Sequence, residues 1–211
     1  MLNKTVYKNL DLLRAEVREA FKVPGVIKKS IRLFRMGLSE PYYVDFDVLI
    51  NDPYICEQIV RLYATKIMEI SRERPIELLG FIEKYSGGTI GAIRIAGAIS
   101  IYTRIPNVPI RLTKEIEFER VKIPPIIGKP RKGRLSGIKV AIITDHSTTG
   151  GEVLNAIDAI EYNGGNVTDV IAFSVRTDAI KLEDFNKKGV VFHSLYRLPE
   201  DLQKIELDLS E

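Results

Sequence analysis

Residues that carry metal and redox chemistry are scarce in this chain of 211 residues. Tryptophan is absent, cysteine occurs once, at Cys56, and histidine occurs twice, at His146 and His193. A single cysteine excludes an internal disulfide framework, and two histidines leave too few soft ligands for a typical zinc site. Any metal that the protein uses must therefore be held by oxygen ligands.

A long apolar run is also missing. The stretch from Ile90 to Tyr102 is interrupted by Arg94 and is too short to span a bilayer. The first residues, MLNKTVYKNLDLL, lack the continuous apolar core of a secretory signal. With 45% hydrophobic and 28% charged residues, we expect a globular cytoplasmic protein without a membrane partner. The abundance of Ile, Lys, Arg and Glu is compatible with a thermophilic source.

Charge is modest overall but uneven along the chain. The net charge of +3 gives no general case for nucleic acid as a partner. The segment from Arg111 to Lys139, however, holds nine basic residues against three acidic ones. Its residues from about 114 to 137 are rich in Pro and Gly and lack apolar periodicity, which predicts a long excursion from the core. This segment is an active-site flap, a nucleic-acid patch or a solvated surface, and the flap is favoured.

The rest of the chain alternates between apolar strands and amphipathic helices. Such alternation favours an α/β fold with an open, mostly parallel sheet flanked by helices. At this length we expect one domain over residues 1–211: an N-terminal helix and small hood to about 48, then the core from about 49. Helices are expected over 8–21, 53–70, 90–102, 152–162 and 182–187, and strands over 26–34, 42–46, 75–82, 108–113, 138–143, 167–175 and 190–193, with a turn over 37–41.

One stretch in the second half of the chain has the outline of a phosphate site. An apolar strand from Ile138 to Ile143 is followed by Asp145, the turn 148–151 (Thr-Thr-Gly-Gly) and a helix that starts at Glu152. The glycines allow backbone amides to approach an anion closely, and the start of a helix adds a partial positive charge. In open parallel sheets, ligands bind beyond the carboxyl ends of the strands. A carboxylate such as Asp145 suits a neutral polyol, for example a ribose, better than a second phosphate.

The same stretch resembles a known family. Residues 140–151 (VAIITDHSTTGG) resemble the phosphoribosyl pyrophosphate (PRPP) signature of type I phosphoribosyltransferases: a hydrophobic strand, two acids, two variable residues and Thr-Thr-Gly. Residues 36–46 (MGLSEPYYVDF) are similar to a Ser-Pro-Tyr-Tyr-x-Asp segment of orotate phosphoribosyltransferases, and residues 190–202 resemble their carboxyl end. The resemblance implies a type I phosphoribosyltransferase-like fold. It also implies transfer of the phosphoribosyl group of PRPP to orotate, which gives orotidine 5'-monophosphate and pyrophosphate.

The resemblance assigns a PRPP site and a pyrophosphate loop. Asp145 would hydrogen-bond the ribose hydroxyls, while the turn 148–151 would hold the 5-phosphate. The PRPP-binding residues would be Thr144, Asp145, His146, Ser147, Thr148, Thr149, Gly150 and Gly151. The loop that meets pyrophosphate would comprise Lys84, Tyr85, Ser86, Gly87, Gly88 and Thr89.

The resemblance also assigns a base site and catalytic residues. Orotate is an acid, so it needs positive partners, which Arg35 and Arg176 would supply through charge-assisted hydrogen bonds. Tyr42 and Tyr43 would flank the base. The catalytic residues would be Lys114 of the flap and Asp145. The resemblance further implies that Mg²⁺ is held by PRPP oxygens, with no direct protein ligand. It also implies that the protein is a homodimer.

Two residues of the signature differ in this chain and keep alternatives open. Thr144 stands where the first acid of the signature is usual, and His146 stands where a small or aliphatic residue is usual. His146 is a candidate general base, or it makes a structural hydrogen bond. In the flap only Lys114 aligns with the family. The alternatives are a non-catalytic, regulatory protein that binds PRPP or a nucleotide, and a phosphoribosyltransferase for another base.

Overall fold

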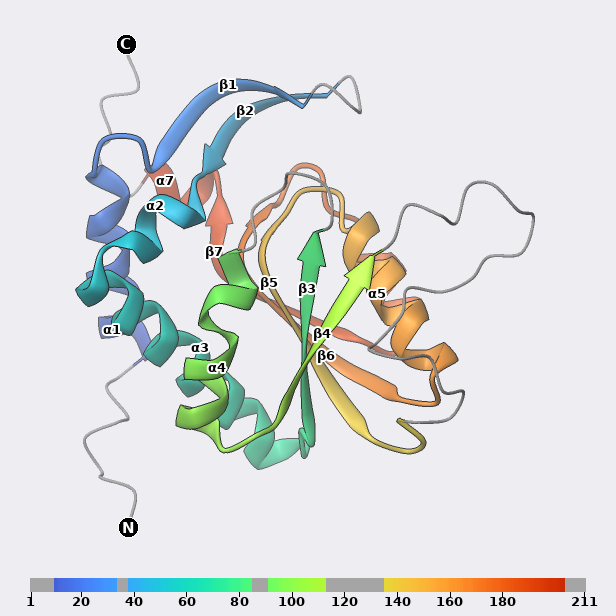
Figure 1. Ribbon diagram of the computed structural model, residues 1–211. Coiled ribbons are helices and arrows are strands. Elements are labelled where there is room, and N and C mark those ends of the chain that lie inside the picture. The colour runs from blue at the N-terminus through green and yellow to red at the C-terminus, as the bar shows by residue number, and fades with distance from the viewer. Residues whose placement is uncertain (1–9, 34–37, 85–90, 113–134, 204–211) are drawn as a thin grey trace.

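A parallel sheet forms the core of the protein. The computed structural model describes residues 10–33, 38–84, 91–112 and 135–203 (Figure 1). Its five-stranded sheet has the order β4-β3-β5-β6-β7, and every neighbouring pair is parallel. These strands are β3 (Leu78–Lys84), β4 (Asn107–Leu112), β5 (Lys139–Ser147), β6 (Asn166–Arg176) and β7 (Val191–Leu198). The expected α/β class with an open, parallel sheet is therefore confirmed.

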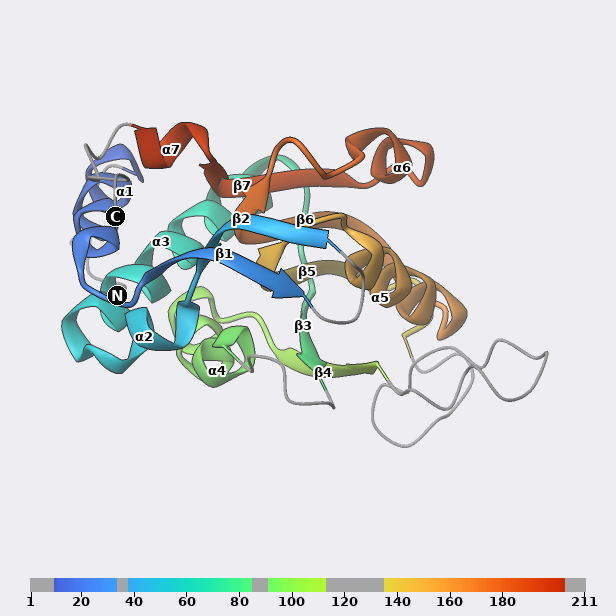
Figure 2. The ribbon, with the colours of Figure 1, turned by 90° about the horizontal axis from the view of Figure 1, so that it is seen from above.

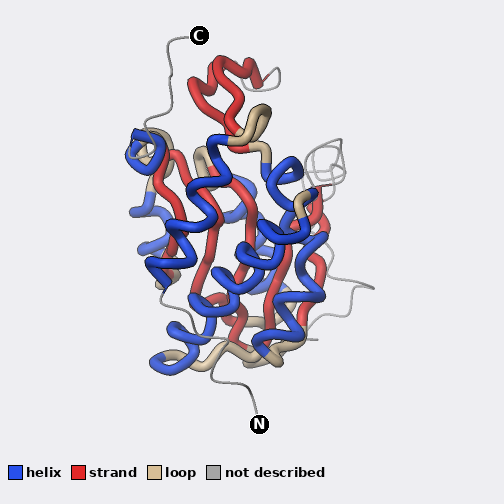
Figure 3. Tube along the Cα trace, turned by 90° about the vertical axis from the view of Figure 1, so that its left-hand side faces the viewer, coloured by secondary structure: helices blue, strands red, loops and turns tan. Residues whose placement is uncertain are grey.

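Helices cover both faces of this sheet (Figure 3). One face packs against α1, α3 and α4, and the opposite face packs against α5 and α6. The helices are α1 (Leu10–Glu19), α2 (Phe46–Asn51), α3 (Pro53–Glu73), α4 (Gly91–Thr103), α5 (Gly151–Tyr162), α6 (Leu182–Lys187) and α7 (Glu200–Gln203), with a 3-10 turn, η2, at Ala20–Lys22. Among the described helices, none is long and apolar enough to cross a bilayer.

The longest helix, α3, follows directly from its sequence. Asp52 caps it by accepting a hydrogen bond from the Ile55 amide at 3.0 Å, and a proline follows at the first helical position. At spacings of four residues, Ile59, Tyr63 and Ile67 are fully buried in the core. The start at residue 53 that the sequence predicts is confirmed.

A small two-stranded hood stands above the carboxyl ends of the core strands (Figures 1 and 2). Strands β1 (Ile27–Leu33) and β2 (Leu38–Val44) pair antiparallel. The expected turn over 37–41 is wrong, because β2 already begins at Leu38. Pro41 fits within this strand because both strands of a two-stranded sheet are edges, where a missing amide donor costs little.

Two further differences from the sequence prediction concern element ends. Phe46 was expected to close a strand but begins α2, because the Asp45 carboxylate accepts a hydrogen bond from the Val48 amide at 3.3 Å. Strand β7 was expected over 190–193 but runs to Leu198, where it pairs with Arg176 of β6. Pairing with a long neighbour extended this strand beyond its own apolar run.

Candidate functional site

The end of β5 is longer and more polar than the sequence predicts. Strand pairing continues through Thr144, His146 and Ser147, so these residues belong to the strand and not to the turn after it. Side chains alternate along a strand, which places Thr144 and His146 on the face that packs against α5. Asp145 points to the opposite face, toward α4. The two positions of the expected acid pair therefore serve different sides of the sheet.

Asp145 lies at the junction of β5 and the start of α4. Its side chain is buried, and its Oδ1 accepts a hydrogen bond from the His146 amide at 2.7 Å. A Cβ atom added to Gly91 would lie 3.2 Å from the other carboxylate oxygen, Oδ2, and 2.4 Å from a ring carbon of Phe46. Only glycine at position 91 lets α4 begin this close to the carboxylate.

Tyr63 of α3 contacts the carboxyl end of β5. Its hydroxyl donates to the backbone carbonyl of Thr144 at 2.7 Å, and its side chain is fully buried. Burial, together with the nearby charge of Asp145, raises the pKa of the Tyr63 phenol well above its usual value. The phenol therefore stays protonated and keeps donating. Sequence reasoning missed this residue, although a polar group within the apolar stripe of α3 was a signal for it.

The turn after β5 has the backbone of an anion cradle. Gly150 has a φ of +83° and forms the N-terminal cap of α5, which begins at Gly151. A Cβ atom on Gly151 would meet only the Thr149 hydroxyl, at 3.8 Å, so the space beside this residue is open. The first amides of a helix have no carbonyl partner within the helix. The turn therefore offers backbone donors and the positive end of a helix dipole to an anion.

Gly150→Ala is expected to lower the free energy of unfolding by about 3 kcal/mol. Its left-handed backbone costs an alanine about 1–2 kcal/mol, and the new Cβ would lie 2.8 Å from the Phe185 ring. The matched control is Gly189→Ala, which has a similar φ of +70° but nothing within 4 Å of its Cβ. Urea unfolding should show the control losing only about 1–2 kcal/mol. Equal losses for the two variants would contradict the packing that we describe around the cradle.

Arg176 ends β6 on the same face of the sheet as Thr144 and His146. Its guanidinium makes two hydrogen bonds to Asp178, from Nε at 3.0 Å and from Nη2 at 2.6 Å. This hydrogen bonding lowers the pKa of the Asp178 carboxyl below its usual value. A two-point contact fixes the plane of the guanidinium. Sequence reasoning missed Asp178, although an acid two residues after an arginine was a local signal.

The remaining predicted site residues are only partly described. The backbones of Tyr42 and Tyr43 lie in β2 of the hood, opposite Lys29 and Lys28, and Lys84 is the last residue of β3. Seven predicted site residues lie outside the described residues, as does the rest of the flap before Leu135: Arg35, Tyr85, Ser86, Gly87, Gly88, Thr89 and Lys114. The structure thus brings together the ends of β3, β5 and β6 with the starts of α4 and α5.

Few acidic groups that could hold a metal lie close together among the described residues at this end of the sheet. Among the residues that the structure describes, no three His, Cys, Asp or Glu side chains group closely enough to hold a metal ion. Asp145 is the carboxylate at the end of β5, while Thr144 offers only a hydroxyl on the other face. These donors fit a metal ion that arrives on the oxygens of a ligand better than one held by the protein itself.

Comparisons with known proteins give a consistent result. The chain is 30% identical over 183 residues to an orotate phosphoribosyltransferase of Methanothermobacter thermautotrophicus, covering 87% of this chain and 91% of that protein. No protein-family model matches. Among solved structures, an orotate phosphoribosyltransferase of Aeropyrum pernix has a TM-score of 0.66 and 18% identity, over 90% of this chain and 97% of that one. Another, of Mycobacterium tuberculosis in complex with PRPP, has a TM-score of 0.60 and 22% identity, over 90% and 99%.

Proposed function

The chain belongs to the orotate phosphoribosyltransferase family, and on this premise we propose that it transfers the phosphoribosyl group of PRPP to orotate. The products are orotidine 5'-monophosphate and pyrophosphate, so the protein is a glycosyltransferase of pyrimidine nucleotide synthesis. The observation that carries the proposal is the turn 148–151 behind Asp145, at the carboxyl end of the central strand. It pairs an anion cradle with a carboxylate that suits ribose hydroxyls.

The proposed reaction requires the protein to position the two substrates and to neutralise the charge of the leaving pyrophosphate. As pyrophosphate departs, the sugar acquires positive charge at its anomeric carbon, and the base must lie over that carbon. The turn 148–151 holds the 5-phosphate while Asp145 holds the ribose hydroxyls, so the sugar is fixed at two points. Donors and cations placed before the reaction stabilise the leaving pyrophosphate. We assign that role to the loop 84–89 and to Lys114 with the basic segment around it.

Magnesium belongs to the proposal as part of the substrate complex. Bound to PRPP oxygens, it would neutralise charge on the departing pyrophosphate. We propose that PRPP oxygens hold the metal, with no direct protein ligand.

The base site is proposed around Arg176. A guanidinium held in one plane by Asp178 is suited to an acidic pyrimidine, because charge-assisted hydrogen bonds are about twice as strong as neutral ones. Tyr42 and Tyr43 belong to the hood that stands over this end of the sheet, and we assign them to the flanks of the base, together with Arg35. A neutral base such as uracil gains less from these cations, which favours orotate.

A homodimer is the proposed state of the enzyme. Helix α4 is apolar along most of its length, and Ile101 on its outer side is 78% exposed. Single exposed apolar residues are common on monomers, so the proposal rests on the resemblance to the family. Light scattering at micromolar concentration would contradict this if it gave the mass of one chain. The cytoplasmic location and thermophilic source remain predictions from composition.

A base screen tests the proposed function. Purified protein with PRPP and Mg²⁺ should release pyrophosphate when orotate is added, and much less with adenine, guanine or uracil. Turnover with one of those bases in place of orotate would assign another phosphoribosyltransferase. Binding of PRPP by calorimetry without product from any base would favour a regulatory binding protein, which the substitution of Thr144 for an acid would then explain.

A further inference from the structure

His146 occupies an unusual place for an imidazole. It is the second-last residue of β5, half-buried, on the face that packs against α5, and two residues before the cradle begins. Two residues of extended strand span roughly 7 Å. Below it on the same face of β5 lie Val140 and Ile142, both fully buried against α5. A titratable ring therefore stands above Thr144 and two buried apolar residues, beneath the amino end of α5.

The neighbour of His146 permits a change of protonation. Nδ1 of the ring lies 2.8 Å from the hydroxyl oxygen of Ser174, which is its register partner on β6 and is fully buried. A serine hydroxyl can donate to a neutral ring nitrogen, or accept from a protonated one. The contact therefore survives when the imidazole gains a proton. An aliphatic residue at position 146 could neither bond Ser174 nor respond to charge.

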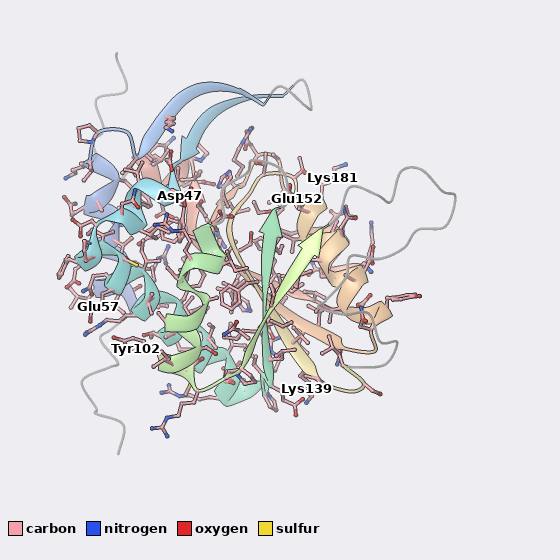
Figure 4. The ribbon with its side chains drawn as sticks, viewed as in Figure 1. Asp47, Glu57, Tyr102, Lys139, Glu152 and Lys181 are labelled. Carbon is pink, nitrogen blue, oxygen red and sulfur yellow. The ribbon has the colours of Figure 1, made fainter. Side chains whose placement is uncertain are left out.

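Charged groups lie at the same end of the sheet as His146 (Figure 4). On β5, Asp145 points to the other face of the sheet, and on β6, Arg176 is paired with Asp178. Figure 4 places Glu152, in the first turn of α5, and Lys181, before α6, at this end of the molecule. The positive end of α5 opposes a cation here. An anion bound in the turn 148–151 would instead favour a positive charge on His146.

We propose that His146 takes up one proton from solvent when the 5-phosphate of PRPP binds in the turn 148–151, and releases it when the phosphate leaves. The imidazolium then acts as a counter-charge to the phosphate dianion, a second source of positive charge beside the helix dipole. The inference rests on the proposed function, because it requires a phosphate in the cradle. At a charge separation on the order of 7 Å and an effective dielectric constant of about 20, each unit of negative charge on the phosphate should raise the pKa of His146 by about one to two units.

The chain offers a clean measurement, because its two histidines give two imidazole Hε1 signals in proton NMR. Titration without ligand and with saturating PRPP and Mg²⁺ should show the pKa of His146 rising by about one unit or more. His193 is the internal control, since its Nε2 lies 2.8 Å from Asp169 at the other end of the sheet, and its Hε1 signal at fixed pH should not respond to PRPP. An unchanged His146 with PRPP bound overturns the inference but leaves the proposed function standing. Failure of PRPP to bind overturns both.

His146→Asn separates charge from structure, because its amide can still hydrogen-bond Ser174 but cannot titrate. The ratio of PRPP affinity between wild type and variant should fall about tenfold from pH 6 to pH 8, which corresponds to one unit of pKa. The second pKa of the phosphate itself, near 6, affects both proteins equally and cancels in the ratio. A ratio that is constant with pH would assign His146 a purely structural role and contradict the inference.

Discussion

Replacing Asp145 by asparagine is expected to lower kcat/KM for PRPP by roughly a hundredfold to a thousandfold. We assign Asp145 to the two ribose hydroxyls, and a hydrogen bond to a charged partner is worth about 1.5–3 kcal/mol. Asparagine keeps the Oδ1 that accepts from the His146 amide, so the local structure should persist. It replaces the second carboxylate oxygen by a donor, which cannot accept from a hydroxyl. Steady-state pyrophosphate release measures the loss.

The control for this variant is Asp158→Asn. Asp158 is an exposed carboxylate on α5 that pairs with Lys188 at 2.7 Å, away from the cradle. Surface pairs of this kind contribute little, so activity and stability should stay close to wild type. Both variants should give the wild-type circular dichroism spectrum. If Asp145→Asn retained more than about a third of the wild-type kcat/KM, a far smaller loss than one charged hydrogen bond predicts, the role assigned to Asp145 would be wrong.

Replacing Asp169 by asparagine is expected to lower the free energy of unfolding by about 3 kcal/mol. Asp169 lies fully buried near the amino end of β6, far from the cradle. Its Oδ1 lies 2.7 Å from Nη2 of Arg74, at the end of α3, and 2.8 Å from Nε2 of His193 on β7. Breaking a buried pair leaves its partner without a counter-charge. Arg74 reaches solvent in part, which keeps the loss at the lower end of the usual range.

The contribution of Asp169 should also depend on pH in one direction. Burial acts to raise the pKa of this carboxyl, but the hydrogen bond from His193 and the charge of Arg74 outweigh it and lower the pKa. The folded state then holds the proton less tightly than the unfolded state. Stability from Asp169 is therefore complete above the ordinary aspartate pKa of about 3.9 and is lost as pH falls through the lower, folded value.

Urea unfolding of wild type and Asp169→Asn from pH 7 to pH 3 measures both effects. The difference between the two proteins should be constant in the upper part of this range and shrink at its acid end. Asp184→Asn is the control, because Asp184 pairs with Lys187 at 3.1 Å on an exposed helix, and its loss should be within about 0.5 kcal/mol. A difference that grows as pH falls would contradict the sign of the pKa shift.

Local patterns in the sequence predict most of the fold. Apolar alternation, helix caps such as Asp52-Pro53 and the glycines at 150 and 151 each mark a structure that depends on neighbours along the chain. The order of strands and helices, the parallel sheet and the position of the turn after β5 could therefore be predicted. Pro41 misled because proline usually marks a turn, whereas a two-stranded hood tolerates it within a strand.

The contacts that hold the site in place join residues far apart in sequence. No local sequence pattern predicts such contacts. Tyr63 reaches the carbonyl of Thr144 across 81 positions, and Phe46 closes the space beside Gly91. The contact between His146 and Ser174 arises from the register of β5 and β6. The sequence left His146 as either a general base or a structural residue. The structure places it beside a hydroxyl that accommodates either protonation state.

A crystal structure of the protein with PRPP and Mg²⁺ tests the central claim most directly. The 5-phosphate oxygens should accept hydrogen bonds from the backbone amides of residues 148–151, within about 3 Å. The ribose hydroxyls should lie within hydrogen-bond distance of the Asp145 carboxylate. A 5-phosphate bound elsewhere, with the turn 148–151 making no contact to it, would contradict the proposed PRPP site.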